Sequence, residues 1–259
     1  MKINELLTRL AMTFVVLASP SAFAEPAKPT IVLVHGAFAG SSSWNGVIKI
    51  LEKDGYTVVA AANPLRSVKR DAQSIQNLVK SIKSPVVLVG HSYGGPVISE
   101  AAYGQANVKA LVYVAAFAPE NGESAVALTG KFPGATLGPT LDTPIALEGG
   151  GKDLYIQQDK FPSQFAADVP VADARLMAAT QRPVTEEALN EAATDAAWKT
   201  IPSWWIFGDK DKNIPPQAMA FMAERAKSRQ TVVVKGASHV VMVSNPRPVA
   251  QIIEAAAKS

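Results

Sequence analysis

Ser92 is the residue in this chain whose surroundings most clearly predict chemistry. It lies at the centre of the motif GHSYG at residues 90–94, which fits the pattern G-x-S-x-G. Apolar residues precede the motif from Pro85, and a helix-compatible segment follows it to about Gln105. This arrangement is typical of a nucleophile elbow, a strained turn between a buried strand and a helix that lifts the serine hydroxyl clear of a sheet. The pattern therefore predicts a nucleophilic serine, and the alternative is a glycine turn around an inert one.

Two later loops carry the groups that activate such a serine. His239 ends the motif GASH and could accept the serine proton as a general base. Asp209 and Asp211 lie in the loop GDKDKNIP at residues 208–215, and a buried carboxylate there would orient the imidazole and stabilise its charged form. We favour Asp211, which is expected to reach inward, whereas Asp209 begins the turn and could be a solvated loop residue.

An acyl-transfer site also needs two amides that stabilise the negative oxygen of a tetrahedral intermediate, and losing one costs about 3–4 kcal/mol. The best sources are the amide of Tyr93, directly after the serine, and that of Ala37 in the loop HGAF. His35 is the first residue of this motif and is interpreted as a structural residue that fixes the loop. His91 points away from the apex of the turn and is also interpreted as structural.

Seven apolar side chains could line an acyl or alcohol pocket, although each is also compatible with ordinary core packing: Phe38, Trp44, Phe117, Phe132, Phe161, Phe165 and Met242. Phe38 and Met242 adjoin segments that carry the candidate catalytic residues. They are therefore the favoured pocket residues.

The hydrophobic pattern predicts an α/β protein. Continuous apolar runs, which indicate strands buried on both faces, alternate with helical segments. The predicted strands cover residues 30–34, 56–62, 85–89, 108–115, 203–207 and 231–234. This alternation predicts a mainly parallel sheet of about six strands flanked by helices. In such a sheet ligands bind at the carboxyl ends of the strands, where the loops carrying Ser92, Asp211 and His239 are expected to meet.

The alternation breaks at Pro119 and resumes after about Thr200. Glycine and proline turns and short alanine-rich helical segments fill the interval. Residues 119–200 are therefore predicted to form a helical cap over the carboxyl ends of the strands. A separate domain is disfavoured because the segment lacks a core of its own. Residues 25–259 are expected to form one domain with this insertion.

Residues 1–24 have the features of a secretory signal peptide. Lys2 and Arg9 precede a short apolar stretch at residues 10–18, and an A-x-A motif ends at Ala24. Cleavage is predicted after Ala24, with export to the periplasm or out of the cell. The apolar stretch is too short to span a bilayer, so no stable membrane anchor is expected.

The composition narrows the function classes. The formal net charge is only +3 and the basic residues are not clustered, so no nucleic-acid-binding surface is predicted. The chain has no cysteine and therefore no disulfide. It also has no H-E-x-x-H motif or Cys/His cluster, so no metal and no other cofactor is expected.

The motifs HGAF, GHSYGG, GDKD-x-x-IPP and GASH, in this order from Thr30 to the C-terminus, resemble those of the α/β-hydrolase superfamily. Within it, the segment VHGAFAGSSSWNGVIKILEKDGYTVVA and the placement of the cap are most similar to the branch that holds plant methylesterases, the salicylate-binding esterase and hydroxynitrile lyases. The resemblance implies a triad of Ser92, Asp211 and His239. It also implies oxyanion amides at Ala37 and Tyr93.

Two departures separate the chain from the hydroxynitrile lyases of that branch, which have Thr at the position of Gly36 and Lys at that of Val240. Without the lysine there is no cation to receive cyanide, which disfavours a lyase. We expect an exported serine hydrolase that cleaves small carboxylic esters through an acyl-enzyme. The alternatives are a cofactor-free haloperoxidase or perhydrolase with the same triad, and a non-catalytic binder of small ligands on a hydrolase fold.

Overall fold

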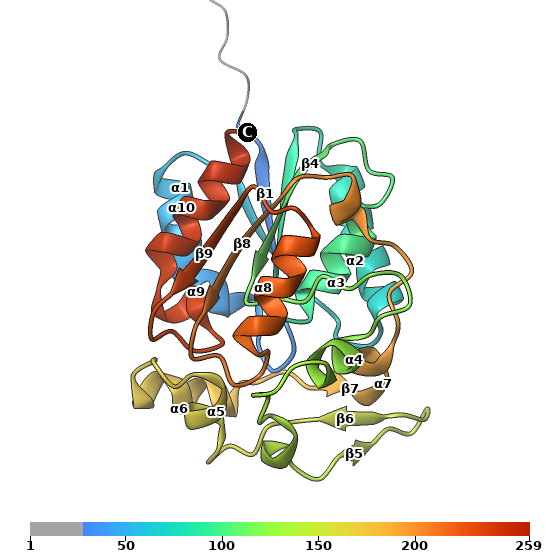
Figure 1. The fold of residues 1–259 in the computed structure, drawn as a ribbon, viewed down its shortest axis with the longest axis vertical. Coiled ribbons are helices and arrows are strands. Elements are labelled where there is room, and N and C mark those ends of the chain that lie inside the picture. The colour runs from blue at the N-terminus through green and yellow to red at the C-terminus, as the bar shows by residue number, and fades with distance from the viewer. Residues whose placement is uncertain (1–27) are drawn as a thin grey trace, which may run out of the picture.

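The computed structural model describes residues 28–259, so the predicted signal peptide lies outside the described residues. Six parallel strands form a sheet with the order β2-β1-β3-β4-β8-β9 (Figure 1). Their bounds are β1 (Thr30–Val34), β2 (Val58–Ala61), β3 (Val86–His91), β4 (Val108–Val114), β8 (Ser203–Gly208) and β9 (Gln230–Val234). The predicted parallel sheet of six strands is thus confirmed.

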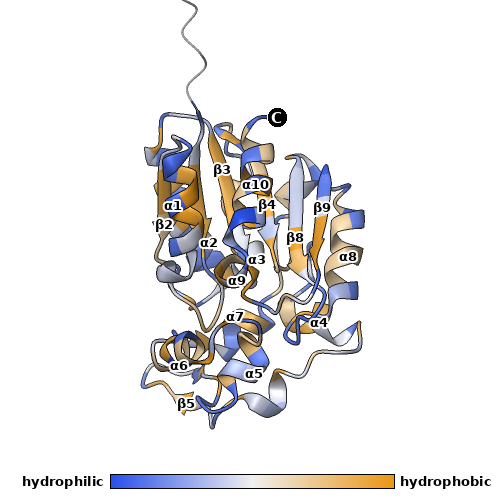
Figure 2. Ribbon diagram, turned by 90° about the vertical axis from the view of Figure 1, so that its left-hand side faces the viewer, coloured by the Kyte–Doolittle hydropathy of each residue, from blue (hydrophilic) through white to orange (hydrophobic). Residues whose placement is uncertain are grey.

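The central strands form because their residues are apolar throughout and are covered on both faces. Every residue of β1 and β3 is buried, and β3 is among the most hydrophobic elements of the sheet (Figure 2). β2 is shorter than predicted. The amide of Tyr56 donates to the carbonyl of Leu51, which ends the preceding helix, so the strand begins two residues later.

Helices cover the two faces of the sheet (Figure 1). α1 (Asn45–Lys53) packs against α10 (Pro246–Ala257), and α2 (Val68–Ser81) packs against α3 (Gly94–Ala102). α8 (Pro216–Arg225) packs against β8. Shorter helical segments are η1 (Ser41–Trp44), η2 (Gly138–Thr140), η3 (Ala197–Lys199) and α9 (Val241–Ser244). No helix within residues 28–259 has the length and apolarity needed to cross a membrane.

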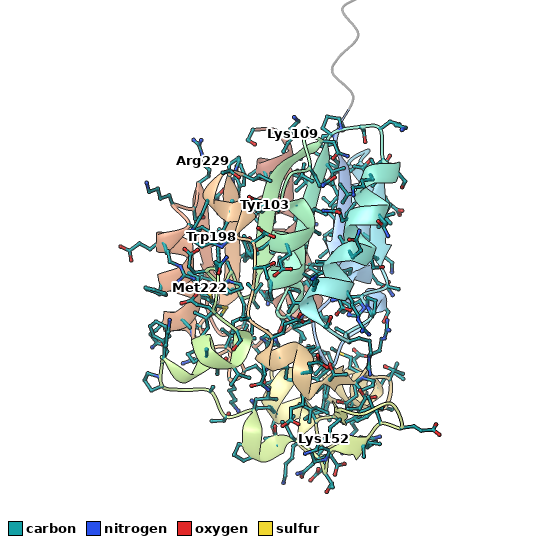
Figure 3. All side chains as sticks on the ribbon, turned by 90° about the vertical axis from the view of Figure 1, so that its right-hand side faces the viewer. Tyr103, Lys109, Lys152, Trp198, Met222 and Arg229 are labelled. Carbon is teal, nitrogen blue, oxygen red and sulfur yellow. The ribbon has the colours of Figure 1, made fainter. Side chains whose placement is uncertain are left out.

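The segment between β4 and β8 lies over the carboxyl ends of the strands. Figure 3 shows this arrangement: Lys109 marks the start of β4, and Lys152, in the cap, lies at the opposite end of the molecule. The cap contains the helices α4 (Ala125–Gly130), α5 (Phe161–Phe165), α6 (Val171–Ala179) and α7 (Glu186–Asn190).

The expectation of a purely helical cap was wrong. The cap also contains a three-stranded antiparallel sheet of β5 (Ile145–Ala146), β6 (Lys152–Leu154) and β7 (Val184–Thr185). These strands are only two or three residues long, too short for an alternating hydrophobic pattern. β7 also pairs with β6 although α5 and α6 lie between these two strands in the sequence. No local sequence pattern predicts this pairing.

The two ends of the cap lie together, and the first of them is attached to α8. The amide of Ala118 donates to the sulfur of Met222 at 3.2 Å, and Arg225 donates to the carbonyl of Ala118 at 2.9 Å. At the other end, the indole of Trp198 donates to the carbonyl of Pro119 at 3.0 Å. Trp198 and Met222 lie on the same side of the molecule in Figure 3. The entry and exit of the cap are therefore held together.

A carboxylate at this junction makes the stability depend on pH. Glu123 pairs with Arg225 at 2.9 Å and with Lys131 at 2.6 Å. Burial alone would raise the pKa of Glu123, but the hydrogen bonds from Arg225, the amide of Glu120 and Lys131 outweigh it and lower the pKa from 4.5 to about 2. A lowered pKa in the folded state stabilises the fold above pH 4.5, and this contribution is lost as the pH falls toward 2.

We therefore expect Glu123→Gln to lower the melting temperature at pH 7, by about 2–4 °C for each kcal/mol lost in a domain of this size. The difference in melting temperature between the variant and the wild type should become smaller as the pH falls from 5 to 3. Thermal unfolding of both proteins across this pH range measures this difference. A difference that stays constant with pH would contradict the role given to the Glu123 charge.

Candidate active site

Ser92 lies at the sharp turn between β3 and α3. Its φ is +54°, in the left-handed region that residues other than glycine rarely adopt. The flanking glycines permit the turn, because a Cβ on Gly90 would lie 2.6 Å from the carbonyl oxygen of Gly94. A Cβ on Gly94 would lie 2.6 Å from the carbonyl oxygen of Val34. The local geometry is that of a strained elbow with its serine at the apex.

Gly95 is the tightest position of this turn. A Cβ there would lie 1.9 Å from the carbonyl oxygen of Phe117, a backbone atom that cannot rotate away. We expect Gly95→Ala to destabilise the fold by about 3 kcal/mol or more, as overpacking of a rigid site does. Chemical denaturation measures this. Gly149→Ala is the matched control, because nothing lies within 4 Å of a Cβ at that position; equal effects of the two substitutions would contradict the prediction.

Three side chains from three loops form a continuous hydrogen-bonded chain. His239 Nε2 lies 2.9 Å from Ser92 Oγ, and His239 Nδ1 lies 2.7 Å from Asp211 Oδ2. All three residues are buried. The second oxygen of Asp211 accepts the amides of Asn213 at 2.8 Å and Ile214 at 3.0 Å. The carboxylate is therefore held so that it orients the imidazole, and the imidazole can accept the serine proton.

Asp209 lies in the same loop as Asp211 but does not join this chain. Its Oδ1 accepts the amide of Gly236 at 2.6 Å, and the residue is only half-buried. Asp209 therefore links the loop after β8 to the loop that carries His239. Of the two aspartates considered, the structure brings Asp211 to the histidine.

His35 has the structural surroundings expected of it. Its Nδ1 lies 3.0 Å from the carbonyl of Gly36, and its Nε2 accepts the amide of Asn63 at 3.1 Å, so Nδ1 carries the proton. Burial lowers the pKa of His35 to about 4, the hydrogen bond to Gly36 opposes the shift, and the charge of Arg182 adds to it. His35 is neutral at pH 7 and holds the loop that follows β1.

His91 lies behind His239. Its Nε2 is 3.1 Å from the carbonyl of His239, which can only accept, so Nε2 is the donor. Burial and then the neighbouring charge of His239 lower the pKa of His91 well below 6.5. A neutral His91 thus supports the backbone of the residue that would act as base.

The amides of Ala37 and Tyr93 have the surroundings of oxyanion donors. Both residues line the cavity around Ser92, and within residues 28–259 neither amide donates a hydrogen bond. The next amide of the first loop, that of Phe38, is occupied, because it donates to the carbonyl of Arg182 at 3.1 Å. The hydroxyl of Tyr93 donates to buried Asp71 at 2.9 Å, which fixes the residue after the serine.

A cavity of about 540 Å³ opens in front of Ser92 and His239. Its walls come from both the sheet and the cap and are mainly apolar, as is usual for small-molecule sites. The apolar lining side chains are Phe38, Phe117, Ala125, Val126, Ala135, Leu137, Leu141, Leu154, Phe165, Leu189 and Ile214. Phe38 thus lies where it was predicted.

Met242 does not line this cavity, and its placement in the pocket was wrong. The side chain is fully buried on α9, which packs against η1 and α1 rather than toward Ser92. Three other candidates, Trp44, Phe132 and Phe161, also lie outside the lining. Adjacency to His239 in the sequence does not bring Met242 to the cavity, because the chain turns away into a helix directly after the histidine.

Sequence reasoning missed the lining residues of α4 and α7 and missed Asn213. No local signal marks them, since they reach the cavity only through the way the cap folds over the sheet. Asn213 is an exception in part, because its position two residues after Asp211 places it next to the carboxylate that orients the base.

The cap is hydrogen-bonded to three loops around the cavity, those that carry Asp211, His239 and Ala37. Gln164 donates to the carbonyl of Lys212 in the loop of Asp211, and Ser238 donates to Asp168 beside His239. The carbonyl of Arg182 accepts the amide of Phe38 beside Ala37. The cap therefore closes the cavity and also holds the loops that form its floor.

Within the described part of the chain, no group of three or more His, Asp or Glu residues is arranged to hold a metal ion. The arrangement provides a nucleophile, a base, a carboxylate that orients the base, and two free amides.

Comparison with known proteins identifies the family of the chain. Residues 31–252 match the sequence profile described as the alpha/beta hydrolase family. The chain belongs to this family. It is similar to the "Alpha/beta hydrolase nvfD" of Aspergillus novofumigatus, with 29% identity over 249 residues that cover 89% of this chain and 97% of that protein.

The similarity also extends to the branch expected from the motifs. Salicylic acid-binding protein 2 of Nicotiana tabacum is 28% identical over 88% of this chain and 96% of its own length. An alpha-hydroxynitrile lyase and methylesterase 2 of Arabidopsis thaliana are 26% and 24% identical. The crystal structure of polyneuridine aldehyde esterase superposes with a TM-score of 0.76, at 21% identity over 88% of this chain and 99% of that one. The predicted fold and branch are confirmed, and the relatives support an esterase-like hydrolase.

Proposed function

We propose that this α/β hydrolase is a serine esterase that cleaves small carboxylic esters through an acyl-enzyme. The observation that carries the proposal is the buried hydrogen-bonded chain from Ser92 Oγ through His239 to Asp211, at 2.9 and 2.7 Å, on the wall of an apolar cavity. On the basis of the predicted signal peptide, we also propose that the enzyme is exported and that the peptide is cleaved after Ala24.

In the first half of the reaction, Ser92 Oγ attacks the ester carbonyl carbon while its proton moves to His239 Nε2. The negative oxygen that forms accepts hydrogen bonds from the amides of Ala37 and Tyr93. The C–O bond to the alcohol then breaks, and His239 returns the proton to the leaving alcohol oxygen. An acyl ester of Ser92 remains.

In the second half, water takes the place of the alcohol. His239 accepts a proton from this water as the oxygen attacks the acyl carbon, and the bond to Ser92 Oγ breaks. The proton passes to Ser92, and the carboxylic acid is released. Asp211 keeps the imidazole in the tautomer with its proton on Nδ1 and stabilises the imidazolium.

Rapid-mixing kinetics with p-nitrophenyl butyrate tests the proposal. An acyl-enzyme predicts a burst of p-nitrophenol with an amplitude close to one equivalent per protein when deacylation is slower than acylation. The acyl-protein should also be visible by intact mass spectrometry after rapid acid quenching. Hydrolysis that proceeds without any acyl adduct under these conditions would exclude the covalent route.

The alternatives have distinct outcomes. A perhydrolase would produce peroxide-dependent halogenation of a dye in acetate buffer, where an esterase without that activity would not. A binding protein would bind esters without releasing alcohol. The unengaged amides of Ala37 and Tyr93 favour the esterase, because a binder has no need of an oxyanion site.

A further inference from the structure

Asp71 is a buried carboxylate that belongs to no part of the triad. It lies in the first turn of α2, is 0% exposed, and forms no ion pair with a basic side chain of residues 28–259. Burial raises the pKa of Asp71 above its ordinary value of 3.8, and hydrogen bonds from the amide of Arg66 and the hydroxyl of Tyr93 oppose the shift. Burying such a group without a cation costs free energy. Its hydrogen-bond partners therefore indicate what the carboxylate does.

The carboxylate of Asp71 is a fixed acceptor. Both of its oxygens lie 3.2 Å from the amide of Arg66, in the turn before α2. The cap holds this turn, because the hydroxyl of Thr185 donates to the carbonyl of Arg66 at 2.7 Å and the amide of Thr185 donates to the carbonyl of Leu65 at 3.1 Å. A group that donates to Asp71 is therefore tied to an acceptor that is itself held in place.

Tyr93 is the side chain that Asp71 holds. Its hydroxyl donates to Asp71 Oδ2 at 2.9 Å, and both residues are 0% exposed. The backbone amide of Tyr93 donates no hydrogen bond within residues 28–259, and the residue lines the cavity around Ser92. A tyrosine side chain has only two rotatable bonds, so fixing its hydroxyl also restricts the position of its amide.

The amide of Tyr93 needs such an anchor because the residue before it is strained. Ser92 has a φ of +54°, a conformation that costs about 1–3 kcal/mol and persists only where the surroundings determine it. The glycines of the turn make room for this conformation but have no side chain with which to hold it. The hydrogen bond from Tyr93 to Asp71 supplies a contact that does. A displacement of about 1 Å in a catalytic site can cost about 10²-fold in rate.

We propose that Asp71 is a positioning residue of the oxyanion site, which acts through the hydroxyl of Tyr93 to hold the Tyr93 amide where the negative oxygen of the tetrahedral intermediate forms. The inference rests on the proposed function, because this oxygen forms only if Ser92 attacks a carbonyl carbon. It assigns a role in transition-state stabilisation to a side chain that does not line the cavity.

A pair of ketones tests this role without relying on turnover. The carbonyl carbon of 1,1,1-trifluoro-2-heptanone is expected to form a bond with Ser92 Oγ, whose proton moves to His239 Nε2. The carbonyl oxygen becomes negative and faces the amides of Ala37 and Tyr93, as in the transition state. 2-Heptanone has the same carbon chain and stays a ketone when it binds. The ratio of the two dissociation constants, measured by calorimetry, therefore reports the oxyanion site, whereas a general change of the cavity affects both ligands.

This ratio would be measured for the wild type, Tyr93→Phe, Asp71→Ala and the double variant that combines the two substitutions. Tyr93→Phe removes the hydroxyl and keeps the ring and the backbone amide. Tyr113→Phe is the matched control, because Tyr113 is also 0% exposed and its hydroxyl lies 2.7 Å from that of Ser99, away from the cavity.

We expect the preference for the trifluoro ketone to fall about tenfold or more in Tyr93→Phe and in Asp71→Ala, while the affinity for 2-heptanone stays within about twofold of the wild type. The double variant should be no worse than the more severe single variant, since both substitutions remove the same contact. Tyr113→Phe should lose stability, as the loss of a buried hydrogen bond does, and keep the preference of the wild type.

An unchanged preference in Tyr93→Phe would overturn the proposal, and this variant carries the test even if Asp71→Ala does not fold. Additive losses in the double variant, or an equal loss in Tyr113→Phe, would also overturn it. So would a wild type that binds the two ketones equally. Ester hydrolysis by the wild type is measured separately. A wild type that prefers the trifluoro ketone but hydrolyses no ester would count against the esterase function alone.

Discussion

Ser92→Ala is expected to lower kcat for p-nitrophenyl esters by a factor on the order of 10⁴–10⁶, the loss that removal of the nucleophile causes in serine hydrolases. The physical reason is that, within residues 28–259, Ser92 Oγ is the hydroxyl that contacts His239 Nε2, at 2.9 Å, and no second one replaces it. The residual rate would come from the oxyanion amides and from substrate binding. Initial rates at saturating ester, with the protein at high concentration to reach the residual rate, measure the effect.

Ser99→Ala is the matched control for this substitution. Ser99 is fully buried and lies on α3, the helix that follows Ser92, but its hydroxyl contacts the carbonyl of Gly95 at 3.0 Å and Tyr113 at 2.7 Å, away from the cavity. Its loss should affect stability more than activity. Comparable kcat values for the Ser92 and Ser99 variants, with both folded by circular dichroism, would contradict the role of Ser92.

Asp211→Asn is expected to lower kcat by about 10⁴, because the substituted amide presents a donor to His239 and favours the wrong tautomer of the imidazole. The amide keeps an oxygen for the two backbone donors of residues 213 and 214, so the loop should hold its shape.

Asp209→Asn is the control, since Asp209 is two residues away in the same loop and its contact to the amide of Gly236 survives the change. We expect its kcat to stay within about threefold of wild type, as for a surface substitution away from the reacting groups. The reverse order, with Asp209→Asn the more severe variant, would show that the orienting carboxylate has been misidentified.

The sheet and the elbow could be predicted because their determinants are local. The continuous apolar run before Ser92 specifies a strand buried on both faces, and the glycines around it are required by contacts of less than 3 Å. The chain order of the loops then brought Ser92, Asp211 and His239 to one edge of the sheet. Each strand and the turn at Ser92 could thus be predicted from a short stretch of sequence.

The cap and the pocket could not be predicted because they depend on contacts between distant segments. β6 and β7 are separated by α5 and α6, and their pairing has no sequence pattern. Met242 was misplaced for a related reason, since its distance from His239 in the sequence is short but α9 turns it into the core. The side-chain oxygen of Asn213 likewise accepts a hydrogen bond from Gln164, a cap residue about fifty positions earlier in the chain.

The central claim is that Ser92 is an activated nucleophile. Intact-protein mass spectrometry after treatment with a fluorophosphonate tests it most directly, on wild type and Ser92→Ala in parallel. The account predicts one phosphonyl adduct on the wild type, located on the peptide that contains Ser92, and none on the variant. Folded wild type that stays unlabelled, or an adduct that persists in Ser92→Ala, would contradict it.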